Sequence, residues 1–244
     1  MNGFLAVFKR ELQGYFATPV AYVFLVIFLF FSGYLPFKAK FFEMGRADLS
    51  LFFENLPFLF MVMVPSVAMR LWAEERRSGS IELLLTLPIS VTQAVLGKFV
   101  AAWTFIAIAL LLTFPMPLTA AYLGHPDVGL IVLGYFGSML MAGAFLAVGS
   151  FFSAVSKSQI ISFILSVVVC ALLIYAGAPT SLKFLSAFLP DGLVEAFEAI
   201  SLPGHIEPML KGILNLYDVA YFLFMIVGWI LSCCIILDER KANS

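Results

Sequence analysis

The chain has 244 residues, of which 62% are hydrophobic and 12% are charged, and its formal net charge at pH 7 is −1. Soluble domains carry about 25% charged residues, so this composition excludes an ordinary soluble protein, and the charge gives no sign of a nucleic-acid partner. A mean hydropathy of +1.04 indicates instead an all-α polytopic membrane protein, with residues 1–244 forming a single transmembrane domain.

The amino-terminal segment, residues 1–18, is amphipathic. Its apolar side chains share one helical face, and Lys9 and Arg10 lie on the opposite face. This pattern predicts a helix that lies in the headgroup layer with its two bases toward anionic lipid. A frayed start of the first membrane span is the alternative, but Pro19 favours a break between the two.

Six apolar runs follow, and each is about long enough to cross the hydrocarbon core of a bilayer. They cover residues 20–35, 51–71, 95–123, 128–153, 160–178 and 217–237. Prolines in the second and third runs predict kinks, because each proline removes a backbone hydrogen bond. Glycines along the fourth run predict a helix that its neighbours approach closely.

The interval 179–216 lies between the last two runs. Two sets of apolar side chains at helical spacing, separated by Pro190, predict two short helices on or in the outer leaflet. A loop packed on the protein surface is the alternative. Acids, Asp218 among them, outnumber bases on this side, and we interpret the excess as a solvated rim and not as a substrate filter.

Lysine and arginine are more frequent on the side of the spans that holds the two termini. By the positive-inside rule this side is cytoplasmic. We therefore expect a multi-pass protein with both termini in the cytoplasm. The bases that set this orientation or mark membrane boundaries are Lys9, Arg10, Arg70, Arg76, Arg77 and Lys98.

The motifs of common active sites do not occur in the sequence. Gly97-Lys98 lacks the upstream glycine and the following hydroxyl residue of a phosphate-binding loop, so no ATP site of that kind is expected. The only histidines, His125 and His205, are both predicted in outer loops, which disfavours a histidine-based metal site. No charged residue falls at the middle of a predicted span, which disfavours an ion-coupled carrier and an intramembrane enzyme. We therefore expect no catalytic, cofactor-binding or metal-binding residue in this chain.

The stretch 70–98 is a long polar interruption on the cytoplasmic side. Gly79 or Ser80 is suited to begin a short helix, and Pro88 ends it. Glu82 would lie in the first turn of this helix, where the helix dipole favours an acid.

This short helix, residues 79–88, is predicted to be a docking element for a cytoplasmic partner, because it joins the second and third spans rigidly. After it, Ser90 and Gln93 match a capping box, S-x-x-Q, that opens the third span. Lipid anchoring is the alternative, but the acids of the stretch would be repelled by an anionic leaflet. The expected contact residues are Gly79, Ser80, Ile81, Glu82, Leu84, Leu85 and Pro88.

Residues 74–84, EERRSGSIELL, followed by Pro88 and then Gly97-Lys98, resemble the signature of type-2 ABC transporter permeases. The segment 147–153 with the following Ser-Gln is similar to the exit of the fourth span in that family. The segment 197–222 resembles the gliding-motility-type subgroup. Together these matches extend over nearly the whole chain.

The resemblance implies an elbow helix at residues 1–18, six spans, a coupling helix at residues 79–88, and short outer re-entrant helices before the sixth span. It implies a membrane-spanning permease subunit of an ATP-driven exporter, without an ATPase site of its own. Its partners would be cytoplasmic ABC ATPase subunits, which hold ATP and magnesium, and a second permease subunit, identical or related, with which it pairs as a dimer.

A bacterial-type cytoplasmic (inner) membrane is the setting that the resemblance implies. Members of the family move polysaccharides, drugs, lipids or proteins, and the sequence does not choose among these cargoes. The alternative to an ABC permease is a polytopic membrane protein that does not depend on ATP, either a secondary carrier or a membrane scaffold.

Overall fold

The computed structural model describes residues 3–38, 49–79, 89–187 and 190–242, and these ranges contain α-helices and no strand. The elements follow in the order α1 (Gly3–Ala17), α2 (Pro19–Lys38), α3 (Ser50–Ala68), α4 (Arg70–Ser78), α6 (Val91–Leu111), α7 (Pro115–Leu123), α8 (Val128–Val155), α9 (Gln159–Tyr175), α10 (Pro179–Ser186), α11 (Asp191–Ile200), α12 (Pro203–Leu210) and α13 (Leu216–Ala242).

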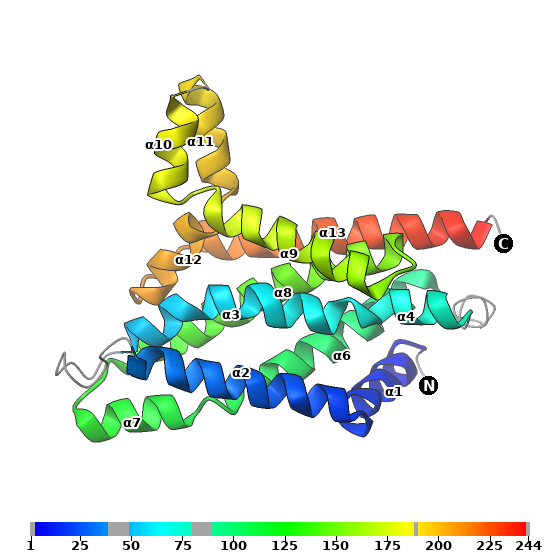
Figure 1. The fold of residues 1–244 in the computed structure, drawn as a ribbon, viewed down its shortest axis with the longest axis horizontal. Helices are drawn as coiled ribbons and strands as arrows, with labels where there is room; N and C mark the ends of the chain where they lie inside the picture. The colour runs from blue at the N-terminus through cyan, green and yellow to red at the C-terminus, as the bar shows by residue number, and fades with distance from the viewer. Residues whose placement is uncertain (1–2, 39–48, 80–88, 188–189, 243–244) are drawn as a thin grey trace.

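The long helices lie side by side, and both ends of the chain lie at the same end of the bundle as α1 and α4 (Figure 1). Among the described residues, five helical stretches are long and apolar enough to cross a membrane, and α9, with 17 residues, is a shorter apolar helix. These helices confirm the predicted all-α polytopic fold. The shared end of the two termini agrees with the even number of predicted spans.

Two of the predicted spans are divided. The third predicted span is split, because α6 ends at Leu111 and α7 begins at Pro115. A proline ring and its missing N–H disrupt the preceding turn, which accounts for this break. The second span is split at Met69, whereas Pro57 and Pro65 lie inside α3. Pro36, which was expected to follow the first span, lies instead inside α2, two residues before its end at Lys38.

The charged stretch after the second span is helical. Residues Arg70–Ser78 form α4, whereas the sequence alone suggested only a polar loop before a helix at residues 79–88. Basic residues in the last turn, Arg76 and Arg77, are favourable near the carboxyl end of the helix dipole. The polar stretch therefore begins with an extension of the second span.

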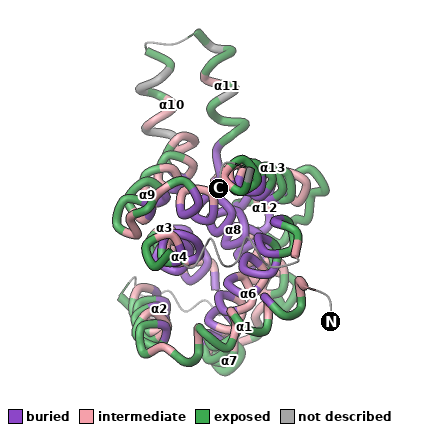
Figure 2. Tube along the Cα trace, turned by 90° about the vertical axis from the view of Figure 1, so that its right-hand side faces the viewer, coloured by how far each residue is buried: buried purple, intermediate pink, exposed green. Residues whose placement is uncertain are grey.

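Helix α8 forms the centre of the bundle (Figure 2), and every residue from Leu140 to Ser150 is buried. Its glycines allow other helices to approach, as predicted. A Cβ atom added at Gly149 would lie 2.4 Å from the Cβ of Ala68 in α3, and one at Gly134 would lie 2.5 Å from the ring of Phe53. Real side chains do not tolerate such distances, so these positions require glycine.

The outer segment contains three helices and not two. Helices α10 and α11 stand away from the long helices (Figure 1), while α12 packs against α8. The sequence PGHIEPML did not predict α12, because it has two prolines and few apolar residues. Two further expectations for this side were wrong. His205 lies in helix α12 and not in a loop, and Asp218 is buried and is not part of a solvated rim.

Candidate functional site

The predicted docking segment 79–88 is attached to α4 on one side. Gly79, the first residue of this segment, has φ 75° and ψ 0° and serves as the C-cap of α4. This left-handed conformation is accessible to glycine at little cost. The other predicted contact residues lie outside the described part of the chain and stay a prediction. They are Ser80, Ile81, Glu82, Leu84, Leu85 and Pro88.

The other flank of the docking segment is the start of α6, which the capping box fixes as predicted. The Ser90 hydroxyl accepts a hydrogen bond from the backbone N–H of Gln93 at 3.2 Å, and the Gln93 side chain accepts one from the backbone N–H of Ser90 at 3.4 Å. The two bonds satisfy helix-end donors that would otherwise lack partners. The docking segment is therefore anchored to a defined helix end on each side.

On α6, after the capping box, Lys98 joins three helices through a buried ion cluster. Its Nζ on α6 lies 2.9 Å from Glu11 Oε1 on α1 and 2.9 Å from Glu75 Oε1 on α4. The Lys98 side chain is only 3% exposed. A buried ammonium group requires such partners, because desolvation of a lone charge costs several kcal/mol. The cluster thus fixes α1, α4 and α6 to one another.

Two more groups complete the cluster. The Lys98 Nζ lies 5.3 Å from the centre of the Trp72 ring, a distance at which the ring attracts a cation. Arg10 Nη2 approaches Glu75 Oε1 at 3.4 Å from the solvent side. Two bases therefore balance two carboxylates, and the cluster carries no excess charge.

Helix α1 also packs closely on α6 next to Lys98. A Cβ atom added at Gly97 would lie 2.9 Å from the side chain of Val7 and 3.2 Å from the carbonyl oxygen of Phe4. Further along, the Tyr15 ring stacks on Phe105 with the ring centres 5.1 Å apart. Burial raises the pKa of the Tyr15 phenol, and the Glu11 carboxylate raises it further, so this side chain keeps its proton. The predicted amino-terminal helix is confirmed as a helix, and its position in the headgroup layer stays a prediction.

The break between α3 and α4 is bridged by Ser153 of α8. Its Oγ accepts hydrogen bonds from the backbone N–H groups of Trp72 at 3.0 Å and Ala73 at 3.1 Å, and donates one to the carbonyl of Met69 at 3.0 Å. A side chain inserted in this way replaces helix bonds that the break removes. Ser153 is fully buried, so the bridge excludes water.

Arg76 adds a second connection from α4 to α8. Its Nη1 donates to the carbonyl oxygens of Ala154 at 2.9 Å and Val155 at 2.6 Å. These carbonyls belong to the last turn of α8, where helical acceptors lack partners within the helix. Arg76 therefore fixes α4 to the central helix of the bundle.

The bases expected at the membrane boundary have different environments. Lys9 and Arg77 are exposed, and Arg70 pairs with Glu74 on the same helix at 2.9 Å. Lys98 is instead buried, and its charge is paired with Glu11 and Glu75 inside the protein. That these bases mark the membrane boundary stays a prediction.

Sequence reasoning did not identify the partners of Lys98. A signal was present, since Lys98 is a single base at the start of an apolar run and Glu11 is the only acid of the amino-terminal segment. Isolated charges of opposite sign next to apolar sequence suggest a buried pair. Ser153 offered no comparable signal, because serine is common in membrane helices.

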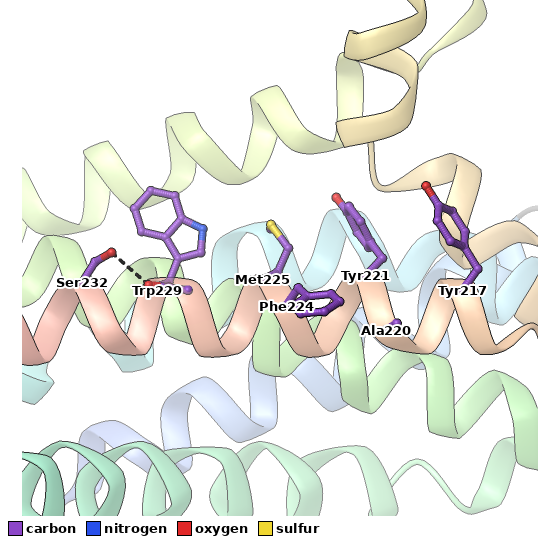
Figure 3. Close-up of a pocket in the computed structure, with 8 residues that line it drawn as sticks. Tyr217, Ala220, Tyr221, Phe224, Met225, Trp229 and Ser232 are labelled. Atoms are coloured by element: carbon purple, nitrogen blue, oxygen red, sulfur yellow. Dashed lines mark hydrogen bonds between the residues drawn. The ribbon is translucent and has the colours of Figure 1, made fainter.

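A groove of about 590 Å³ runs along α13, and its walls are apolar and aromatic. The side chains project from one face of this helix (Figure 3). The residues that line the groove are Tyr217, Ala220, Tyr221, Phe224, Met225, Gly228, Trp229 and Ser232. Its polar side-chain groups are the hydroxyls of Tyr217, Tyr221 and Ser232 and the indole N–H of Trp229. In the described ranges, no group of three or more His, Cys, Asp and Glu side chains is placed to hold a metal ion.

Comparison with known proteins identifies the family of the chain. The family described as ABC-2 family transporter protein matches residues 5–218, which is most of the sequence. A search of curated proteins found no match. The gliding-motility subgroup expected from residues 197–222 stays a prediction. The chain therefore belongs to the ABC-2 transporter family, as a membrane permease subunit of an ABC transporter.

Proposed function

We propose that this chain is the permease subunit of an ATP-driven exporter, and that a separate ABC ATPase subunit docks on residues 79–88. The observation that carries the proposal is the buried cluster around Lys98. It fixes α4 and α6, the helices that flank the docking segment, to each other and to α1. A segment that only anchors in lipid does not require its two flanking helices to be fixed to each other.

The contacts behind the segment define two routes for a displacement. Through α4, the bonds of Ser153 and Arg76 carry it to α8, which contacts most of the other helices. Through α6, the close approach at Gly97 and the Lys98 ion pairs carry it to α1. A push by the partner on residues 79–88 would thus move the core of the bundle and the amino-terminal helix together.

The remaining parts of the proposal follow from the family. ATP and magnesium are bound by the partner subunit, a second permease subunit completes the membrane pathway, and substrate moves outward when the ATPase closes. The membrane is the cytoplasmic (inner) membrane, with both termini in the cytoplasm and α1 as an elbow helix in the headgroup layer. The excess of cytoplasmic lysine and arginine supports this orientation.

The test is ATPase activity in the purified complex of this chain with an ABC ATPase subunit, in lipid. Glu82→Lys is expected to weaken docking, and Gly79→Pro to displace the segment, because proline fixes φ near −65° whereas Gly79 has φ 75°. Both variants should lose the stimulation of ATP hydrolysis by the permease while their membrane helices stay folded. Lys157→Gln, at an exposed base in the turn between α8 and α9, is the control and should keep it.

Two results would overturn the proposal. One is unchanged stimulation in both docking variants. The other is a failure of any ABC ATPase subunit to co-purify with the chain from native membranes, which would favour a carrier or a scaffold that does not use ATP.

A further inference from the structure

His205 and Asp218 form a buried pair at the outer end of the bundle. His205 lies in α12 and Asp218 in the first turn of α13, and the two residues are 5% and 4% exposed. Neither takes part in the docking site at the opposite end. Buried ionisable groups are costly in a membrane protein and are retained where they hold a structure or perform a function.

Both ring nitrogens of His205 face an oxygen atom. Nδ1 lies 2.9 Å from Asp218 Oδ1, and Nε2 lies 3.1 Å from the carbonyl oxygen of Ala199 at the end of α11. The second carboxylate oxygen of Asp218 accepts a hydrogen bond from Asn215 Nδ2 at 3.0 Å. One imidazole ring therefore connects α11, α12 and α13.

The ring is also held on its face. The Tyr221 ring of α13 stacks on it with the ring centres 3.9 Å apart and the planes 21° apart, and the Tyr221 hydroxyl donates to the carbonyl of Ile200. Tyr217 lies one turn away on the same face of α13 (Figure 3), with its ring 5.3 Å from the imidazole. This stacking fixes the plane of the ring, so its nitrogens cannot turn toward other partners.

A count of protons follows from this geometry. A neutral imidazole has one N–H donor and one acceptor, whereas a carbonyl oxygen and an ionised carboxylate only accept. Both contacts of His205 are satisfied when the ring carries two protons, or when Asp218 carries the second. In each arrangement one proton lies between Nδ1 and Oδ1. When it leaves, the ring retains one N–H, and one of the two contacts is lost.

The pair lies where α12 and the residue before it contact helices α8 and α9. Helix α12 packs its Ile206 and Met209 against Gly137 of α8, where an added Cβ would lie 3.0 Å from the Met209 sulfur. The backbone N–H of Leu202, just before α12, donates to the carbonyl of Leu173 in α9 at 2.9 Å. The position of α12 against the bundle thus depends on what holds the segment 199–218.

The other groups around His205 leave Asp218 as its partner for this proton. On α13, Tyr217 and Tyr221 are the further titratable groups against the ring. Helix α11 presents the Ala199 carbonyl, α8 meets α12 at a glycine, and α9 reaches the segment through a backbone carbonyl. The nearby Glu207 on α12 is exposed and pairs with Lys211.

We infer that His205 is a positioning residue whose shared proton with Asp218 clips α11 and α12 to α13. The clip holds with the proton bound and loosens when the proton leaves, because one of the two contacts of the ring is then lost. Protonation on the outer side therefore favours the closed outer end. The clip itself is independent of the proposed function, and only its effect on export depends on that function.

The test is hydrogen exchange in the purified chain alone, in lipid, at about pH 6 and about pH 8.5, on either side of the histidine range. Results are expressed as protection factors, so that the intrinsic pH dependence of exchange cancels. The peptide that contains the N–H groups of Ser201 and Leu202 is expected to lose protection several-fold at the higher pH. His205→Phe keeps a ring to stack on Tyr221 but has no N–H, and should show low protection at both pH values.

Two controls separate the clip from general destabilisation. His125→Phe changes the only other histidine, which is exposed, and should behave as the unaltered chain. Asp218→Asn lets a neutral ring accept from the amide and still donate to Ala199, so the fall in protection at the higher pH should disappear. This variant keeps the test informative if His205→Phe fails to fold.

Either of two results would overturn the inference: protection in the unaltered chain that does not depend on pH, or His205→Phe with the same protection factors as the unaltered chain. Export by the complex with the ATPase subunit is a separate measurement. A fall in protection at the higher pH, in a chain with which no ABC ATPase subunit co-purifies, would leave the clip in place and remove the proposed function.

Discussion

The two ends of the bundle each contain a buried charge cluster that joins three helices. At the end that holds the two termini, Lys98 joins α1, α4 and α6 through two carboxylates, and at the opposite end His205 joins α11, α12 and α13 through one carboxylate and one carbonyl. Lysine keeps its proton throughout the physiological range, whereas histidine titrates within it. We therefore expect the Lys98 joint to be permanent and the His205 joint to depend on its shared proton.

This difference agrees with the position of each cluster. The Lys98 cluster joins the two helices that flank the predicted docking segment, where rigid contacts would transmit a displacement. The His205 pair joins α12 to α13, at the end where substrate would leave in the proposed export. The following changes test whether the first joint is rigid and the second releasable.

The largest effect is expected from Lys98→Met. It leaves the carboxylates of Glu11 and Glu75 with only the exposed Arg10 as a cation, and removal of one partner of a buried ion pair costs about 3–5 kcal/mol. Thermal unfolding of the purified protein in lipid measures the loss. Lys157→Met, at an exposed base on the same side, should change stability by less than about 0.5 kcal/mol. Equal effects of the two changes on stability would contradict the conclusion that the buried cluster stabilises the fold.

Asp218→Ala at the outer end should cost about 1.5–3 kcal/mol, because it removes the carboxylate from His205 and from Asn215. The cost should be greater at acidic than at alkaline pH, since the protonated ring depends on the carboxylate most. Denaturant unfolding at two pH values measures this difference. An effect of Lys98→Met that varied with pH in the same way would erase the contrast between the two clusters.

Ser153→Ala tests the connection from α4 to α8 and should cost about 1–2 kcal/mol, since it removes three buried hydrogen bonds at the break after α3. The loss of ATPase stimulation should be larger than the fraction of unfolded protein explains. Ser66→Ala is the matched control, because this buried hydroxyl bonds only to the carbonyl of Val62 in its own helix. Loss of stimulation in both variants would mean that the bridge has no special role.

The smallest effect is expected from Arg70→Gln. Its pair with Glu74 is solvent-exposed and spaced one helical turn apart, and such pairs contribute about 0.3–0.5 kcal/mol. Unfolding at low and high salt measures it, and the effect should vanish at high salt. A loss of stability as large as that of Lys98→Met would show that burial does not decide how much an ion pair stabilises this protein.

The helices of the fold were largely predictable from the sequence. Apolar runs located the long helices, the capping box at Ser90 fixed the start of α6, and Pro19 separated α1 from α2. These signals are local, because each depends on the solvation or backbone geometry of neighbouring residues. Helices α4 and α12 were missed, since their sequences are polar or rich in proline and their helical state depends on packing against α8.

The sites were less predictable than the helices. The docking segment 79–88 was predicted from its pattern of charge and proline, and because all of it except Gly79 lies outside the described residues, it stays a prediction. The pair of Lys98 and Glu11 spans 87 positions, and Ser153 bonds to a residue 81 positions away. A sequence records that such groups exist, but it does not record which of them meet.

By itself the sequence determined that this is a membrane protein, that its chain crosses the bilayer as helices, and that a charged segment interrupts these helices near Gly79. Burial of apolar surface and satisfaction of backbone groups within lipid dictate these features residue by residue. Only the tertiary structure decided that Lys98 is an internal joint and that His205 lies within hydrogen-bond distance of Asp218. A buried charge is tolerated only where packing brings its counter-charge within hydrogen-bond distance, and packing is a property of the whole bundle.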